Sequence, residues 1–79
     1  MNANQIVAEV AKLNGITVDD MKSDSRAWRY SHPRQEAMWR LREEKGWSWK
    51  RIADKLNLLD HTTVIAGYRS YKRRLYTWR

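Results

Sequence analysis

Apolar residues near the C-terminal end of this chain recur at intervals of four and three, which is the spacing of one face of an α-helix. This stripe consists of Val64, Tyr68, Tyr71, Leu75 and Trp78. We expect it to face the core of the domain, because an aromatic stripe at this spacing is typical of packing rather than of a cofactor site. The chain has no stretch with the apolar–polar alternation of a strand. The sequence therefore predicts an all-α domain.

Helix caps and helix breakers divide the rest of the chain into further helices. Apolar periodicity and capping residues predict these helices near residues 3–14, 18–23, 33–45 and 48–56. Gly15 and Gly46 follow two of the segments, where a helix end favours a left-handed residue. Pro33 suits the first position of its helix, with Ser31 or His32 as the cap. A chain of 79 residues has room for only one small core.

The basic residues are concentrated in the later two-thirds of the chain. With 16 Lys and Arg against 9 Asp and Glu, the net charge is +7. Residues 1–24 carry a net charge of −2, whereas residues 25–79 carry +9. A positive balance of this size in a small chain favours a polyanionic partner, usually nucleic acid. We therefore expect residues 25–79 to build the binding surface, including a basic loop over residues 23–31, and the first 24 residues to serve as scaffold.

The chain lacks the residues that several classes of function require. The chain has no cysteine, no glycine-rich phosphate loop and no apolar run near the ~20 residues that span a membrane. His32 and His61 are 29 positions apart and make a poor start for a metal site. Asp60 and His61 beside a threonine do not indicate a nucleophile, because adjacent residues on a helix point in different directions. We expect no enzyme activity and no cofactor, metal, nucleotide or membrane partner. We also expect the protein to be cytoplasmic.

The last two predicted helices and the turn between them match the helix-turn-helix pattern. Ser48 caps a short helix, residues 57–59 form the turn, and Asp60 caps a longer helix with polar residues at its start. In this motif the second helix enters the major groove, and its first residues contact base edges. Lys50 and Arg51, at the start of the first helix, are candidate phosphate contacts, although a solvated helix face explains them almost as well.

The residues at the turn narrow the prediction to one family. Asp60-His61-Thr62-Thr63-Val64 resembles the signature of the C-terminal DNA-binding domain of the bacterial replication initiator DnaA. Further positions that match the family pattern are Val10-Ala11, Ile16, Val18, Asp20, Ser23, Arg26, Pro33-Arg34-Gln35 and Ala37-Met38. The similarity covers roughly residues 5–75. It implies a small helical bundle of the DnaA C-terminal and Trp-repressor type, as a stand-alone domain over residues 1–79 without the initiator's ATPase domain.

The resemblance also implies two DNA-binding elements. The start of the last helix would approach bases in the major groove with Asp60, His61, Thr62 and Thr63. Arg26, in the basic loop, would enter the adjacent minor groove, whose narrow A·T-rich form attracts arginine. Arg34 and Gln35, at a helix N-terminus, would hold phosphates. Arg29 and Arg69 complete the set of candidate DNA contacts.

Three departures from the family pattern leave the target site open. Leu59 stands where a basic residue is frequent, Ala66 where a histidine is common, and Trp28 where an arginine is frequent. We predict sequence-specific binding to double-stranded DNA at DnaA-box-like sites, regulating replication or transcription in a bacterium, a phage or a prophage.

The five tryptophans support a second hypothesis, although we expect most of their rings to cover the thin core. In this alternative the chain is a small adaptor that binds a replication or transcription protein through a Trp-rich surface, with only non-specific DNA contact. Structured RNA is a weaker third partner, because a helix-turn-helix fits B-form DNA and the RNA major groove is narrow.

Overall fold

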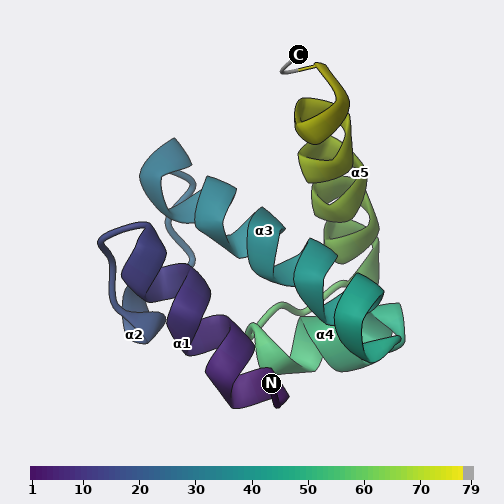
Figure 1. Cartoon of the computed structure of the whole chain (residues 1–79), viewed down its shortest axis with the longest axis horizontal. Helices are drawn as coiled ribbons and strands as arrows, with labels where there is room; N and C mark the ends of the chain where they lie inside the picture. Colours follow the sequence, from purple (N-terminus) through teal and green to yellow (C-terminus); the bar gives the residue numbers. More distant parts are fainter. Residues whose placement is uncertain (78–79) are drawn as a thin grey trace.

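The computed structural model describes residues 1–77, which form five α-helices and no strand (Figure 1). The helices are α1 (Ala3–Leu13), α2 (Val18–Met21), α3 (Trp28–Lys45), α4 (Trp49–Lys55) and α5 (His61–Thr77). The all-α prediction is confirmed, and α1, α2 and α4 begin and end within two residues of their predicted limits.

None of the described helices is long and apolar enough to cross a membrane. Across residues 1–77, no three acidic or histidine side chains gather into a group that could hold a metal ion.

Side-chain caps explain where the shorter helices start. Asn2 accepts a hydrogen bond from the Gln5 N–H at 2.9 Å, and the Gln5 side chain accepts one from the Asn2 N–H, closing a capping box at α1. Thr17 and Asp20 form the same reciprocal pair at α2. Ser48 caps α4 by accepting from a main-chain N–H one turn later. These bonds satisfy N–H groups that a helix start otherwise leaves without partners.

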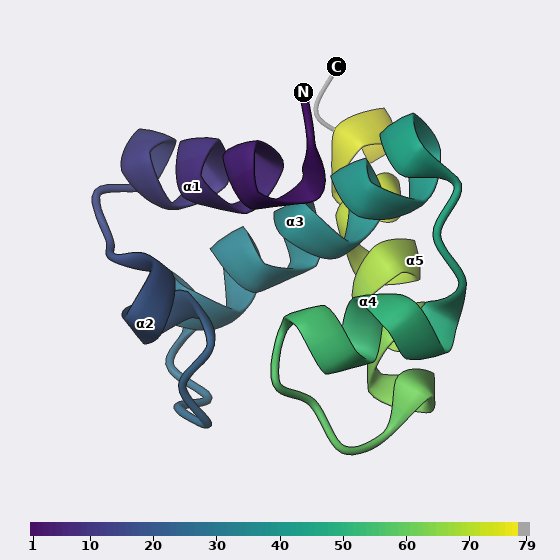
Figure 2. The same ribbon diagram turned by 90° about the horizontal axis from the view of Figure 1, so that it is seen from below.

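α3 lies at the centre of the bundle and packs against each of the other four helices. Figure 2 shows α1 and α2 on one side of it and α4 and α5 on the other. The core is a single cluster that consists of Ile6, Val7, Val10, Ala11, Met21, Ala37, Met38, Leu41, Ile52, Ala53, Leu56 and Val64. Because α3 shares this core with every other helix, it joins the N-terminal scaffold to the helix-turn-helix.

Gly67, which is buried, lets α5 approach α3 closely. A Cβ atom built at this position would overlap the sulfur of Met38 and press on the side chain of Gln35. Glycine costs about 1 kcal/mol relative to alanine in a helix interior. A larger residue at this position would force the Met38 side chain to move within the core.

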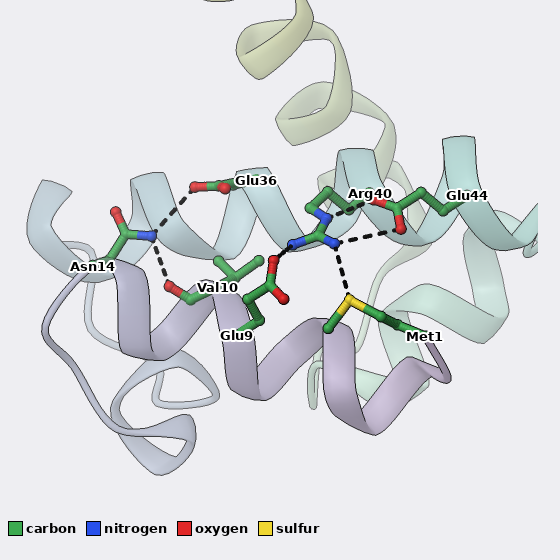
Figure 3. Close-up of polar contacts among 7 residues, drawn as sticks. All are labelled: Met1, Glu9, Val10, Asn14, Glu36, Arg40 and Glu44. Atoms are coloured by element: carbon green, nitrogen blue, oxygen red, sulfur yellow. Dashed lines mark hydrogen bonds and ion pairs between the residues drawn. The ribbon is translucent and has the colours of Figure 1, made fainter.

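Polar contacts fasten α1 to α3 (Figure 3). The Arg40 guanidinium group on α3 lies 2.6 Å from Glu44, one turn further along, and 2.8 Å from Glu9 on α1. Its hydrogen bonds to Glu44 and Glu9 raise the pKa of Arg40, and the bond with Arg40 lowers the pKa of Glu44. At the other end of α1, the Asn14 amide donates to Glu36 at 3.2 Å. Arg40 is therefore a basic residue whose charge is neutralised within the scaffold.

α3 begins five residues earlier than predicted, so the expected start at Pro33 and cap at Ser31 or His32 are wrong. The Ala27 carbonyl accepts hydrogen bonds of 2.9 Å from the N–H groups of Tyr30 and Ser31, which builds a helical turn before the proline. Pro33 then lies in the second turn, where its missing N–H removes a single intrahelical bond. The predicted basic loop is shorter as a result, because its last four residues belong to the helix.

Only the first half of the apolar stripe on α5 belongs to the core. Val64 is completely buried, and Tyr68 and Tyr71 are half-buried. Leu75 is 39% exposed, and Trp78 lies outside the described residues. The expectation that the stripe faces the core therefore holds for its first positions and is wrong for Leu75. The last turns of α5 project away from the bundle (Figure 1), which leaves them without a covering helix.

The tryptophans fall into two groups by exposure. Trp39, Trp47 and Trp49 are partly buried, and Trp47 and Trp49 cover the edge of the core, as expected. Trp49, for example, packs edge-on against Tyr68 with ring centroids 5.2 Å apart. Trp28 differs, because it is 73% exposed at the start of α3.

Candidate nucleic-acid interface

α4, the turn after it and α5 form the predicted helix-turn-helix (Figure 2). The chain reverses at Asn57, whose φ of 61° lies in the left-handed region that asparagine tolerates better than most residues. The Leu58 N–H then donates to the Ala53 carbonyl at 2.8 Å, which closes the turn back onto α4. α4 packs against α5, with Ile52 and Val64 both fully buried. This packing holds α5 in place while its first turn stays outside the core.

The first turn of α5 presents four polar side chains to solvent. Asp60 Oδ1 accepts a hydrogen bond from the Thr62 N–H at 2.9 Å, so Asp60 caps the helix as predicted. This hydrogen bond lowers the pKa of the Asp60 carboxyl group. His61 Nδ1 lies 3.9 Å from the same carboxylate. Asp60, His61, Thr62 and Thr63 are all exposed, so the core requires none of them.

A groove of about 240 Å³ lies between the first half of α3 and the face of α5 that is turned toward it. Its lining residues are Ser31, Arg34, Gln35, Met38, Thr63, Ala66, Gly67 and Ser70. Gln35 is held at this groove because its side-chain oxygen accepts a hydrogen bond from Arg74 at 2.6 Å. Gln35 was expected at a helix N-terminus, but it lies in the second turn of α3, beside the polar face of α5.

Arg34 is buried, although the resemblance placed it on a phosphate at a helix N-terminus. Its Nε atom donates to the Met21 carbonyl at 2.7 Å, and Nη2 donates to the carbonyls of Ser23 and Ser25 at 2.7 and 3.1 Å. Burial lowers the pKa of Arg34, and the Asp24 carboxylate opposes this effect. The expected position is wrong because α3 starts earlier, which turns Arg34 inward. Its Nη2 atom therefore holds the loop before α3, and its Nε atom ties α3 to the end of α2.

The other basic candidates remain at the surface. Arg26 is exposed in the loop before α3, and Arg29 is exposed in the first turn of that helix. Lys50 and Arg51 on α4 and Arg69 on α5 are exposed as well. Figure 2 shows the segment that leads into α3 and the α4–α5 turn projecting from the same side of the molecule. Two elements that are far apart in sequence are thus presented together.

A family model described as "Bacterial dnaA protein helix-turn-helix" matches residues 3–70, which is most of the chain and includes both elements. The chain belongs to this family. Membership in the family implies that the helix-turn-helix binds DNA. No solved structure matched the chain.

Curated relatives support the same assignment. The chain is 37% identical over 65 residues to the chromosomal replication initiator protein DnaA of Magnetococcus marinus. The aligned region is 82% of this chain and 14% of that protein. It is 39% identical over 64 residues to the protein of the same name from Lacticaseibacillus casei, covering 81% of this chain and 14% of the relative. The match to the Trichormus variabilis protein is 37% over 60 residues, 76% of this chain and 13% of the relative. The chain therefore spans about a seventh of the length of these relatives.

Two features near the interface were missed from the sequence. The inward position of Arg34 has no signal in the chain, because its acceptors are main-chain carbonyls that any residue provides. The exposure of Trp28 does have a signal, since it lies between Arg26 and Arg29 in a segment without apolar periodicity. An aromatic residue in such surroundings indicates a ring outside the core.

Proposed function

We propose that this protein binds double-stranded DNA sequence-specifically, with the first turn of α5 in the major groove and Arg26 in the adjacent minor groove. The observation that carries the proposal is the exposure of all four polar residues from Asp60 to Thr63 at the start of a helix-turn-helix. The core needs none of these side chains, whereas base edges require hydrogen-bonding groups of this kind.

The chemistry of the four residues suits base edges. A threonine hydroxyl hydrogen-bonds to a base, and its methyl group packs on the methyl group of thymine. The capping bond of Asp60 occupies Oδ1, and an aspartate also accepts from cytosine N4. Arg26 is exposed on a loop that Arg34 holds in place, which suits entry into a narrow A·T-rich groove.

In the cell, the proposed role is occupation of DnaA-box-like sites that regulate replication or transcription, without chemistry by the protein itself. The relatives are named as chromosomal replication initiators, which supports sites connected with replication. A protein with this role acts on DNA in the cytoplasm of a bacterial cell, whether the chain is of host, phage or prophage origin.

Selection of bound duplexes from a random library provides the test. We expect one recurring sequence, and each of Thr62→Ala and Thr63→Ala should weaken binding to it by about 1–3 kcal/mol while hardly changing binding to a random duplex. Thr77→Ala makes the same chemical change at the other end of α5 and serves as the matched control. Thermal unfolding should be nearly unchanged in all three, because exposed substitutions are usually within ~0.5 kcal/mol. Equal binding of the selected duplex by wild type and both threonine variants would contradict the proposal.

A further inference from the structure

An exposed tryptophan lies beside the arginine that we assign to the minor groove. Trp28 is 73% exposed, whereas Trp39, Trp47 and Trp49 are partly buried. It lies between Arg26 and Arg29, and both of these arginines are exposed. Leaving an indole ring in water is unfavourable. A ring flanked by cations is suited to a partner that combines negative charge with an apolar surface, and a nucleic acid provides these in its phosphates and its stacked bases.

The neighbours of Trp28 brace its ring without burying it. His32, one turn later on α3, packs against it with ring centroids 5.8 Å apart. Ile16 and Pro33 lie with Trp28 along a cavity of about 490 Å³ at the surface. Burial, and then the charge of Arg74, lower the pKa of His32, which favours the neutral form of this ring. The ring therefore packs on His32 on one side and keeps a large surface in solvent.

We propose that Trp28 inserts between base pairs from the minor groove, next to Arg26, and bends the duplex. This inference rests on the proposed function and adds to it a contact that senses how easily the DNA deforms. Apolar side chains that enter the minor groove partly unstack one base step and bend the duplex by roughly 20–90°. The positive charges of Arg26 and Arg29 beside the ring match the phosphates of the DNA rather than an apolar protein surface.

If Trp28 inserts between base pairs, the protein should prefer a DNA flank that unstacks easily. Insertion of Arg26 alone does not predict this preference. Pyrimidine–purine steps such as TA unstack easily, whereas A-tracts are stiff with a narrow minor groove that attracts arginine. Two flanks of equal A·T content therefore separate the two effects. Insertion of Trp28 favours the flank with a TA step, and insertion of Arg26 by itself favours the A-tract.

The experiment uses the duplex selected from the random library, with 2-aminopurine at successive positions of the A·T flank. This base brightens when it unstacks, and a pair of dyes on the duplex ends reports the bend. We expect the wild-type protein to brighten one step and bend the DNA, and Trp28→Ala to abolish both effects. The affinity should fall roughly 5- to 150-fold, the range of one aromatic–base stack. Trp28→Phe should keep part of each effect, because a smaller ring still stacks.

Tyr76→Ala is the matched control, because it removes a ring that is 64% exposed in the last turns of α5. We expect it to change neither signal, and thermal unfolding of each variant verifies that it is folded. If the Trp28→Ala variant bends and binds the selected duplex like the wild-type protein, the insertion of Trp28 is contradicted and the proposed function stands. A loss of affinity without loss of the 2-aminopurine signal also overturns it, because the ring then contacts only the backbone. If wild type does not prefer the selected duplex over random DNA, the proposed function fails and the insertion of Trp28 fails with it.

Discussion

Arg34 Nε on α3 donates a 2.7 Å hydrogen bond to the main-chain carbonyl of Met21, thirteen residues earlier in the chain. The Nη2 atom of the same side chain bonds the carbonyls of Ser23 and Ser25, so one buried residue holds the segment that leads to Arg26. A loop that is already held loses less conformational freedom when it meets a partner. We therefore expect Arg34 to support the proposed binding indirectly, by holding the segment next to Arg26 in place.

Replacement of Arg34 by lysine tests this clamp. One ammonium group cannot reach three carbonyls in the fixed fork of a guanidinium. We expect Arg34→Lys to lower the free energy of unfolding by about 1.5–3 kcal/mol, the range for a hydrogen bond to a charged group. Urea unfolding measures the loss, and Arg69→Lys, at an exposed position, is the control. Stability equal to wild type would show that the carbonyls are satisfied without the guanidinium group.

Arg26→Ala should weaken binding more on duplexes with an A·T-rich flank than on those with a G·C-rich flank. The reason is the stronger negative potential of a narrow minor groove. Titration of both duplexes at one salt concentration gives the two affinities, and Lys45→Ala, exposed at the end of α3, is the control. An equal loss on both flanks would instead assign Arg26 to a phosphate.

The affinity should fall steeply with salt. With Arg34 buried and Arg40 paired within the scaffold, the exposed candidates are Arg26, Arg29, Lys50, Arg51 and Arg69. If about four or five of these contact phosphates or the groove, log K against log [salt] should have a slope near −4. Lys50→Ala should reduce the slope by about 1 and weaken selected and random duplexes by similar factors. Lys12→Ala, on α1, should leave the slope unchanged, and a flat response of the wild-type protein would place the DNA surface elsewhere.

The cap at Asp60 should make stability depend on pH in the acid range. The Thr62 N–H lowers the pKa of Asp60 in the folded protein, so the stabilisation is present above the pKa of the unfolded chain. It is lost as the pH falls through the lower pKa of the folded protein. We expect Asp60→Asn, which also caps helices, to remove this part of the acid dependence. Thermal unfolding between pH 2.5 and 6 is the measurement, and identical profiles for the two proteins would contradict the prediction.

The parts of the fold that sequence reasoning predicted correctly depend on residues close together in the chain. The cap at Ser48, the turn before Asp60 and the burial of Val64 follow from neighbours within one or two helical turns. Local patterns of this kind also led to the helix-turn-helix and its family. The exposed first turn of α5 was predicted for the same reason.

The start of α3 and the place of Arg34 could not be predicted in this way. A proline is most often found at a helix start, but α3 has already begun five residues before Pro33, with the turn that is bonded to the Ala27 carbonyl. The partners of Arg34 are carbonyls 9 to 13 residues away, brought near by the packing of α2 on α3. Carbonyls are present at every position of a chain, so no residue pattern marks which of them an arginine will meet.

The contact of Gly67 with Met38 has a consequence for the length of the DNA target. α3 and α5 meet there without a side chain of Gly67 between them, and we expect this packing to fix the distance between the two elements proposed to contact DNA, the loop with Arg26 and the first turn of α5. One additional base pair advances the duplex by about 3.4 Å and rotates it by about 35°. A rigid protein cannot follow that step, and it then engages one groove or the other. If the protein binds DNA as proposed, the spacing between the base pairs under α5 and the A·T flank that Arg26 enters should therefore contribute to specificity, in addition to the bases themselves.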